Sequence, residues 1–404
     1  MRPSLLALCL LLATSAHAHA QAHAQDAAHK LAQDAVIVDT HIDAPGILMD
    51  TWADLGIEAK DREFDYPKAR AGGLDVAFMS IYTSAGQDAD GSAWQVANAM
   101  IDGVEALVQR HPDRFALLTS PADVARLREG GRVLLPLGME NGAPIGDTLA
   151  NLQFFFDRGV RYITLAHSAN NRIADSSYVQ DKQWNGLSPF GRQVVKEMNQ
   201  LGIMVDVSHL GDASAMEAIE LSTVPVIASH SAFRHFTPGF ERNISDELAK
   251  AVAAKGGVVQ VPFGSAFIDP ASAADTQAHF RAINDFNRHN AELKAQGKPA
   301  LDRAQFDKDW EAAHPPRQST LAQVLDQIDY GVQLIGIDHV GIGSDFDGVG
   351  GELAEGLRTV ADFPNLVAGL QARGYDEAGI GKILRGNLLR TWARIEAGAA
   401  QQQD

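Results

Sequence analysis

Residues 35–45, AVIVDTHIDAP, decide how the rest of the chain is interpreted. The apolar beginning of this stretch predicts a buried strand, and His41 and Asp43 stand two residues apart near its end. Residues i and i+2 of a strand point to the same side, so an imidazole and a carboxylate would leave the strand together. Such a pair suits a metal ion, although a single His-x-Asp is more often an ordinary polar strand end.

Seven later segments repeat this pattern of a short apolar run that ends in polar residues and is followed by a helical stretch. Strands that alternate with helices favour right-handed crossovers and a parallel sheet. We therefore predict an α/β fold, a (β/α)8 TIM-type barrel. An open doubly wound sheet is the competing fold, but no glycine-rich phosphate loop follows the first strand. The eight predicted strands cover residues 35–43, 73–82, 132–141, 160–167, 202–209, 225–231, 256–264 and 339–347.

The gap between the seventh and eighth predicted strands is too long for one crossover helix. Residues 268–317 are charged and largely helical in pattern, and we predict that they form an insertion over the barrel mouth. No change in composition calls for a second domain. We therefore predict one catalytic domain over residues 35–398, followed by a disordered tail at 399–404.

The first 20 residues are typical of a signal peptide. A positive start and an apolar run precede two Ala-x-Ala patterns, so we expect cleavage near Ala18–Ala20 and a secreted, most simply periplasmic, protein. The apolar run is too short to be a stable membrane anchor. We expect residues 21–34, rich in Ala, Gln and His, to be a flexible leader, although their histidines could also sequester metal.

Composition narrows the classes of partner and ligand. The formal charge of −17 argues against a general binder of nucleic acid or anionic membranes. The only cysteine, Cys9, lies in the predicted signal peptide. A metal site in the mature chain would therefore use histidine and carboxylate ligands.

In barrel enzymes the chemistry lies at the C-terminal ends of the strands. Each polar residue there could be structural on its own, but their shared position indicates a site for first-row metals, and Zn²⁺ fits nitrogen and oxygen ligands without thiolate. Two such ions would share a hydroxide and favour hydrolysis, with Asp345 as the acid/base. The residues at these predicted ends are His41, Asp43, Glu140, His167, His209, His230, Asp345 and Asp347.

The sequence resembles the membrane (renal) dipeptidase family of binuclear zinc peptidases, within the amidohydrolase-like barrels. The resemblance covers roughly residues 36–397. Its most specific parts are the block from GLSPFG to VDVSH and the block SDFDG. The motifs that carry it, in chain order, are VDTHID, GMEN, YITLAHSAN, GLSPFGRQVVKEMNQLGIMVDVSH, VIASHS, RNISDE and GIGSDFDG.

This resemblance implies a role for each site residue. His41 and Asp43 match the ligands of one zinc ion, His209 and His230 match those of a second, and Glu140 matches the carboxylate that bridges them. His167 and Arg242 match the residues that contact the scissile group and the C-terminal carboxylate of the substrate, and Asp345 matches the acid/base aspartate. A bidentate arginine would restrict the enzyme to short substrates with a free carboxylate.

Two further expectations concern residues around this site. Asp39 shares its side-chain direction with His41 and could orient it as an outer-shell partner. Phe263 and Phe267, after the seventh predicted strand, could make the pocket more apolar than is usual in the family.

The sequence therefore predicts a secreted or periplasmic zinc dipeptidase that hydrolyses dipeptides through a metal-bridging hydroxide and tolerates a D-residue at the C-terminal position. The alternative is another amidohydrolase-type enzyme that acts on an N-acyl amino acid, a lactam or a lactone. A non-catalytic metal-binding barrel is disfavoured because all five ligand positions and Asp345 are present. The resemblance also implies a homodimer. We expect no nucleic-acid partner and no membrane anchor in the mature chain.

Overall fold

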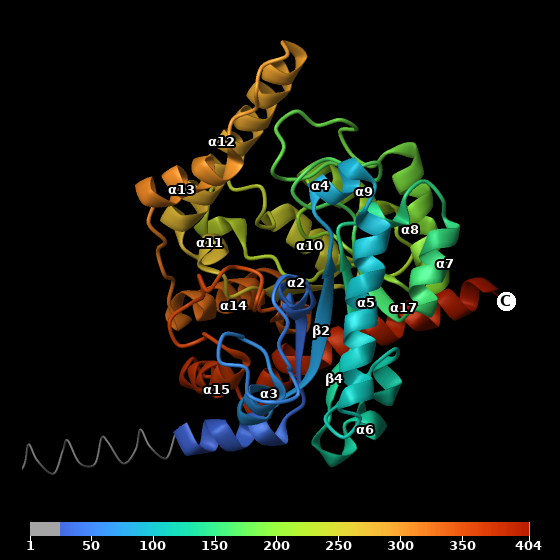
Figure 1. The fold of residues 1–404 in the computed structure, drawn as a ribbon. Coiled ribbons are helices and arrows are strands. Elements are labelled where there is room, and N and C mark those ends of the chain that lie inside the picture. Colours follow the sequence, from blue (N-terminus) through green and yellow to red (C-terminus); the bar gives the residue numbers. More distant parts are fainter. Residues whose placement is uncertain (1–24, 404) are drawn as a thin grey trace, which may run out of the picture.

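The computed structural model describes residues 25–403, and ten short strands form a single parallel sheet at its centre (Figure 1). The sheet curls until its first and last strands meet. Ile42, at the end of the first strand, pairs with Phe346, which follows the last. The strands are β1 (Ile37–Ile42), β2 (Leu74–Tyr82), β3 (Phe115–Leu117), β4 (Val133–Leu135), β5 (Leu137–Glu140), β6 (Val160–Thr164), β7 (Met204–Asp206), β8 (Ile227–Ala228), β9 (Val258–Val261) and β10 (Val340–Ile342).

This arrangement confirms the predicted (β/α)8 barrel, with two differences in the strands. The third predicted strand is divided into β4 and β5 at Pro136, which has no N–H to give to a neighbouring strand. The strand β3 is additional and pairs only with β4, at the edge of the sheet. It has three residues, too few to show the period-2 alternation by which a strand is recognised in a sequence.

Helices surround the barrel, and α8 illustrates how the sequence sets their limits. The Ser188 hydroxyl accepts a hydrogen bond from Gly191 N, Pro189 starts the first turn, and Gly202 ends the helix with φ of 80°. The helices of the barrel are α2 (Ala44–Asp50), α3 (Tyr66–Gly72), α4 (Ala85–Asp90), α5 (Ala93–Arg110), α6 (Val124–Leu127), α7 (Ala150–Asp157), α8 (Pro189–Leu201), α9 (Asp212–Leu221), α10 (Asp246–Ala254), α14 (Leu321–Ile335), α15 (Phe363–Ala372), α16 (Glu377–Gly381) and α17 (Asn387–Gln403).

The predicted insertion at 268–317 is helical. It contains α12 (Pro270–Ala295) and α13 (Arg303–Ala313), and the short α11 (Ser265–Ile268) leads into it. The first turns of α12 lie against the barrel mouth, where Phe280 stacks on Tyr178 with ring centroids 3.9 Å apart. The rest of α12 projects away from the barrel in Figure 1. Only its beginning can therefore shape the site.

Both ends of the described chain differ from the prediction of flexible segments. Residues 25–34, assigned to a leader, form a helix in which Ala28 and Ala32 are buried one turn apart. The Gln33 side chain also donates to the carbonyl oxygens of Arg70 and Ala71 in α3. At the other end α17 continues through residues 399–403, which we expected to be disordered.

The predicted signal peptide, residues 1–20, lies outside the described residues. Between residues 25 and 403, no helix has the length and apolar character needed to cross a membrane.

Candidate active site

Every site residue predicted from the sequence lies at or just beyond the C-terminal end of a strand, apart from Arg242, which lies further along the chain. His41 is the second-last residue of β1 and Glu140 is the last residue of β5. His167, His209, His230 and Asp345 follow β6, β7, β8 and β10 after two or three residues. Because the strands are parallel, all of these side chains are brought to the same rim of the barrel.

The Glu140 carboxylate is the centre of this group. Its Oε1 lies 3.0 Å from His209 Nε2, 3.3 Å from His167 Nε2 and 3.4 Å from His230 Nε2. Its Oε2 lies 3.5 Å from His41 Nε2. One buried carboxylate thus faces four imidazoles, with one oxygen toward His41 and the other toward the remaining three.

Three overlapping groups of these residues could each hold a metal ion. In each group the potential ligand atoms lie within 4.8 Å of one another: His41, Glu140 and His230; Glu140, His167 and His209; and His41, Asp43 and Asp345. The fully buried His41 Nε2 has no hydrogen-bond partner among the described residues, although Asp43 Oδ2 is 3.3 Å away. An unsatisfied ligand atom among nitrogen and oxygen donors fits a first-row cation such as Zn²⁺.

The cluster strongly perturbs its own protonation. Burial alone would raise the pKa of Glu140, but the imidazoles of His41 and His167 hold it well below its ordinary value. Burial, reinforced by the positive charge of Arg242, lowers the pKa of His209 well below the usual value. Both effects keep ligand atoms deprotonated, which is the state that binds a cation.

Asp345 has the opposite perturbation. Burial, together with the carboxylates of Asp43 and Glu140, raises the pKa of Asp345 well above its ordinary value. Its backbone is in the left-handed region with φ of 67°, and so is that of His209 with φ of 66°. Such conformations are uncommon for non-glycine residues and concentrate at functional sites. A Cβ at Gly348 would lie 2.2 Å from Asp43 Oδ2 and 2.3 Å from Asp345 Oδ1, so a larger residue here would displace these carboxylates.

The His41 ring is oriented by a residue that we did not predict. Its Nδ1 lies 2.7 Å from the hydroxyl of Tyr162, which is fully buried. The prediction that Asp39 orients the His41 ring was wrong. Asp39 Oδ1 accepts hydrogen bonds from the backbone N–H groups of His41 and Ser344, and not from the ring. Gly138 provides the space for Tyr162, since a Cβ there would lie 2.0 Å from its ring.

His230 is oriented by a buried chain of hydrogen bonds. Its Nδ1 lies 2.8 Å from Ser229 Oγ, which in turn donates to Asp206 Oδ2 at 2.6 Å. The same Asp206 oxygen accepts from Thr164 Oγ1 at 2.5 Å. Because the Ser229 hydroxyl donates its proton to Asp206, its oxygen accepts a hydrogen bond from His230 Nδ1–H. The lone pair of the His230 ring is therefore on Nε2, which faces Glu140.

Arg242 lies at the base of the group. Its Nη2 donates to the His230 carbonyl oxygen at 2.8 Å and lies 2.9 Å from His209 Nε2, and its Nη1 donates to Ser231 Oγ at 3.1 Å. The guanidinium carbon is 4.7 Å from the centroid of the Phe267 ring. Among the described residues Arg242 Nε has no partner. The arginine is therefore close enough to the histidines to influence them as well as a substrate.

A cavity of about 640 Å³ opens above these residues. Its floor includes Asp43, Glu140, His167, His209 and Asp345, and its apolar walls include Phe267, as expected. Phe263 does not reach the cavity. It is buried against Phe346 and Phe363 and belongs to the core. The walls that we did not predict are Tyr82, Tyr178, Phe280, Ile47, Met49, Val96, Met100 and Val349.

Beside the site, the half-buried Glu63 and the buried Asp347 each accept a hydrogen bond from the backbone of the other. Glu63 Oε2 accepts from Asp347 N, and Asp347 Oδ1 accepts from Glu63 N at 2.9 Å. Burial and the nearby Asp347 charge raise the pKa of Glu63 to about 7 from 4.5. Below pH 4.5 the carboxyl is protonated in both the folded and the unfolded chain. As the pH rises from there to about 7, the unfolded chain loses this proton first, so folding becomes less favourable.

We therefore expect Glu63→Gln to stabilise the protein above pH 7 but not below pH 4.5. The melting temperature should rise by on the order of 2 °C at pH 8 relative to the parent chain. Thermal unfolding of both proteins at the two pH values measures this difference. Glu58→Gln, at an exposed glutamate, is the matched control. An equal shift at both pH values would contradict the assignment to Glu63 ionisation.

Two residues missed by the sequence analysis orient predicted ligands: Tyr162 contacts His41 from another strand, and Ser229 contacts its neighbour His230. Both residues carry only weak signals in the sequence. Tyr162 has an inward position on a predicted strand, and Ser229 stands next to a predicted ligand. No spacing in the sequence places Tyr162 beside His41, 121 residues earlier. Their contribution becomes visible only when the barrel is assembled.

A parallel barrel with clustered histidines and carboxylates at its C-terminal rim is the arrangement of a metal-dependent hydrolase. Comparison with known proteins makes the class more specific. Residues 25–404 match the family model described as membrane dipeptidase, peptidase family M19. The chain belongs to this family of metallo-dipeptidases, as the resemblance in the sequence had indicated.

Individual relatives agree with this assignment. An uncharacterized dipeptidase of Schizosaccharomyces pombe is 30% identical over 94% of this chain and 85% of its own length. The dipeptidase tcpJ of Claviceps purpurea is 28% identical over 84% of this chain and 71% of its own length. The crystal structure of the probable dipeptidase PvdM from Pseudomonas aeruginosa superimposes with a TM-score of 0.79 at 28% identity, covering 93% of this chain and 99% of that one.

Proposed function

We propose that this protein is a zinc-dependent dipeptidase that binds two ions, bridged by Glu140. The observation that carries the proposal is the position of one buried carboxylate between four histidine Nε2 atoms, all within 3.5 Å of its oxygens. In this proposal His41 and Asp43 hold one ion, and His209 and His230 hold the other. When bound, the ions polarise the scissile carbonyl and lower the pKa of a water molecule.

The remaining predicted residues act on the substrate. Asp345, whose pKa is raised, accepts the proton of the attacking water and passes it to the leaving nitrogen. His167 lines the cavity, and its imidazole donates to the carbonyl oxygen as negative charge develops there. Arg242 receives the C-terminal carboxylate of the dipeptide, which fixes the length of the substrate.

The proposal has three further parts that rest on the sequence. The signal-like residues 1–20 support export, with the periplasm as the simplest destination. The family resemblance supports tolerance of a D-residue at the C-terminal position and a homodimeric assembly.

A dipeptide library, varied in chirality at both positions and supplied with Zn²⁺, tests the function. We expect hydrolysis of free dipeptides and no hydrolysis of tripeptides or dipeptide amides. Metal analysis of the same sample should give two zinc ions per chain. Failure on every dipeptide by fully loaded protein would reject the proposal, and turnover of an N-acyl amino acid, a lactam or a lactone instead would assign a different hydrolase.

We expect Ser229→Ala to weaken zinc binding, because it removes the hydrogen bond that fixes His230 Nδ1. Loss of such an outer partner typically costs about 10–100-fold in metal affinity. Competition with a chromophoric chelator measures this affinity directly. Ser214→Ala is the matched control, since Ser214 is equally buried but donates to the Gly186 carbonyl in another part of the barrel. Unchanged zinc affinity in Ser229→Ala would contradict the proposed orientation of His230.

A further inference from the structure

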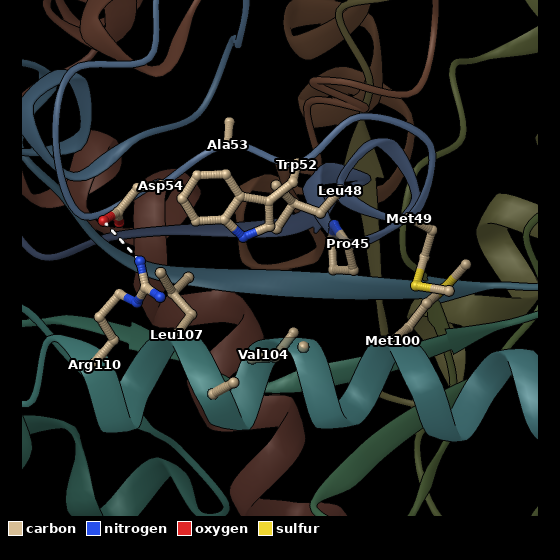
Figure 2. A pocket seen from close by; sticks show the side chains of 12 residues that line it. Pro45, Leu48, Met49, Trp52, Ala53, Asp54, Met100, Val104, Leu107 and Arg110 are labelled. Carbon is tan, nitrogen blue, oxygen red and sulfur yellow. Dashed lines mark hydrogen bonds and ion pairs between the residues drawn. The ribbon is translucent and has the colours of Figure 1, made fainter.

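An apolar groove lies beside the catalytic cavity, between α2 and α5 (Figure 2). It has a volume of about 270 Å³. The indole of Trp52 lies across it, with Arg110 at one end and the side chains of Met49 and Met100 at the other. The other side chains that line it are Pro45, Leu48, Ala53, Asp54, Val104, Ala106 and Leu107.

The groove adjoins the catalytic cavity. Met49 and Met100 line both spaces and approach each other at the end of the groove. Methionine side chains are flexible and adapt to different apolar partners. Met49 and Met100 therefore form a wall between the groove and the catalytic cavity that can rearrange when a ligand extends from one space into the other.

Two large apolar side chains of the groove are exposed to solvent. Trp52 is 68% exposed and Met49 is 49% exposed. Arg110 lies beside the indole: its guanidinium carbon is 5.4 Å from the centroid of the ring, and Arg110 is itself paired with Asp54 at 3.5 Å. A large exposed aromatic ring over a groove offers a face on which a ligand can stack.

The position of the groove determines which part of a substrate could enter it. Helix α2 begins directly after the proposed ligand Asp43 and leads outward for about 9 Å to Met49 and Asp50. Arg242, which would hold the C-terminal carboxylate, is instead beside His209 and His230. With the carboxylate at Arg242 as proposed, we expect the N-terminal residue of a bound dipeptide to lie on the side of α2.

We propose that the groove is a subsite for a long apolar side chain on the N-terminal residue of the substrate, with Trp52 stacking on its far end. This inference rests on the proposed dipeptidase function and specifies its substrate class. In this proposal a methyl side chain makes the least use of the groove, and a long aromatic side chain makes the most.

Gly103 provides a direct test. It lines the groove from the exposed side of α5, and a Cβ built on it meets no atom within 4 Å. Gly103→Leu therefore adds an apolar side chain to the groove from a position where the Cβ has open space, and it replaces a poor helix former with a good one. Gly103→Ala, which adds only a methyl group, should have the smaller effect. Trp52→Ala removes the stacking surface, and an exposed side chain leaves no internal void when it is truncated.

The zinc-loaded protein is assayed with Ala-Ala, Leu-Ala, Phe-Ala and O-benzyltyrosyl-Ala. We expect kcat/KM to increase along this series. The ratio of kcat/KM for the longest substrate to that for Ala-Ala should fall about tenfold in Gly103→Leu and in Trp52→Ala. Leu301→Ala, at a similarly exposed apolar residue outside the groove, should keep the parent ratio.

An unchanged ratio in both groove variants would overturn the subsite while leaving the dipeptidase function intact. A loss of self-association in these variants, with the ratio unchanged, would assign the groove to contact between copies of the chain and would also overturn it. If no dipeptide is hydrolysed, the proposed function fails separately. In that case the subsite is tested by binding, measured as the quenching of tryptophan fluorescence by O-benzyltyrosyl-Ala. Quenching in the parent protein that is lost in Gly103→Leu supports the subsite, and absence of quenching in the parent protein overturns it.

Discussion

Glu140→Gln is expected to abolish dipeptide hydrolysis and to remove zinc from both positions. Glutamine has nearly the same shape, but it places a neutral amide between the four imidazoles that now face a carboxylate. An amide has one oxygen to offer a cation, whereas a bridging position requires two. The loss corresponds to several kcal/mol of transition-state stabilisation, about a thousandfold in kcat/KM.

Metal analysis and kinetics on the same preparation measure both effects. The matched control is Glu396→Gln, at a partly buried glutamate in α17 that accepts a hydrogen bond from Ser120. Circular dichroism establishes that both variants are folded. Two zinc ions bound to an inactive Glu140→Gln protein would show that Glu140 is not the bridging ligand, and full activity would refute the proposed site altogether.

Arg242→Met is expected to raise KM for dipeptides while leaving the zinc content intact. The charge-assisted hydrogen bonds to a substrate carboxylate are worth roughly 2–3 kcal/mol, or about a hundredfold in affinity. Methionine keeps most of the apolar volume against Phe267. The parent protein should therefore discriminate strongly between a free dipeptide and its C-terminal amide, and the variant should lose this discrimination.

The contacts of Arg242 make a second outcome informative. Its Nη2 lies 2.9 Å from His209 Nε2, so the arginine could instead position the histidines. In that case Arg242→Met would lower zinc affinity and reduce turnover of the acid and the amide equally. Measurement of both substrates and of the zinc content separates these roles, and the second result would contradict the proposed recognition of the carboxylate.

The barrel and the candidate site could be predicted because their signals are local. Each strand combines an apolar run with a polar end, and parallel strands bring these ends to one rim. His41, Glu140 and His230 could thus be grouped from the sequence although they are far apart along the chain. The three-residue β3 depends on pairing with β4, which local patterns do not specify. The division between β4 and β5, in contrast, has a local signal in Pro136 that the predicted single strand overlooked.

Other features could not be predicted because they depend on contacts between distant elements. Trp52 and Met100 are brought together only when α2 packs against α5. The helix at 25–34 is stabilised by burial of Ala28 and Ala32, while its composition alone suggests a flexible leader. The Tyr162 contact with His41 requires the space above Gly138, which is a property of the assembled barrel.

Because the contacts between the ends of β1 and β10 join distant parts of the chain, we expect the site to be one of the last parts of the molecule to form. Ser344 N donates to Asp39 Oδ1 across 305 residues of chain, and Asp43 N donates to the Phe346 carbonyl oxygen at 2.8 Å. Contacts of such long sequence separation form late, because the chain entropy lost in closing so long a loop must be offset by other contacts. A growing or partly folded chain therefore holds His41 and Asp43 without Asp345 beside them, and hydrolytic activity can arise only after the barrel has closed.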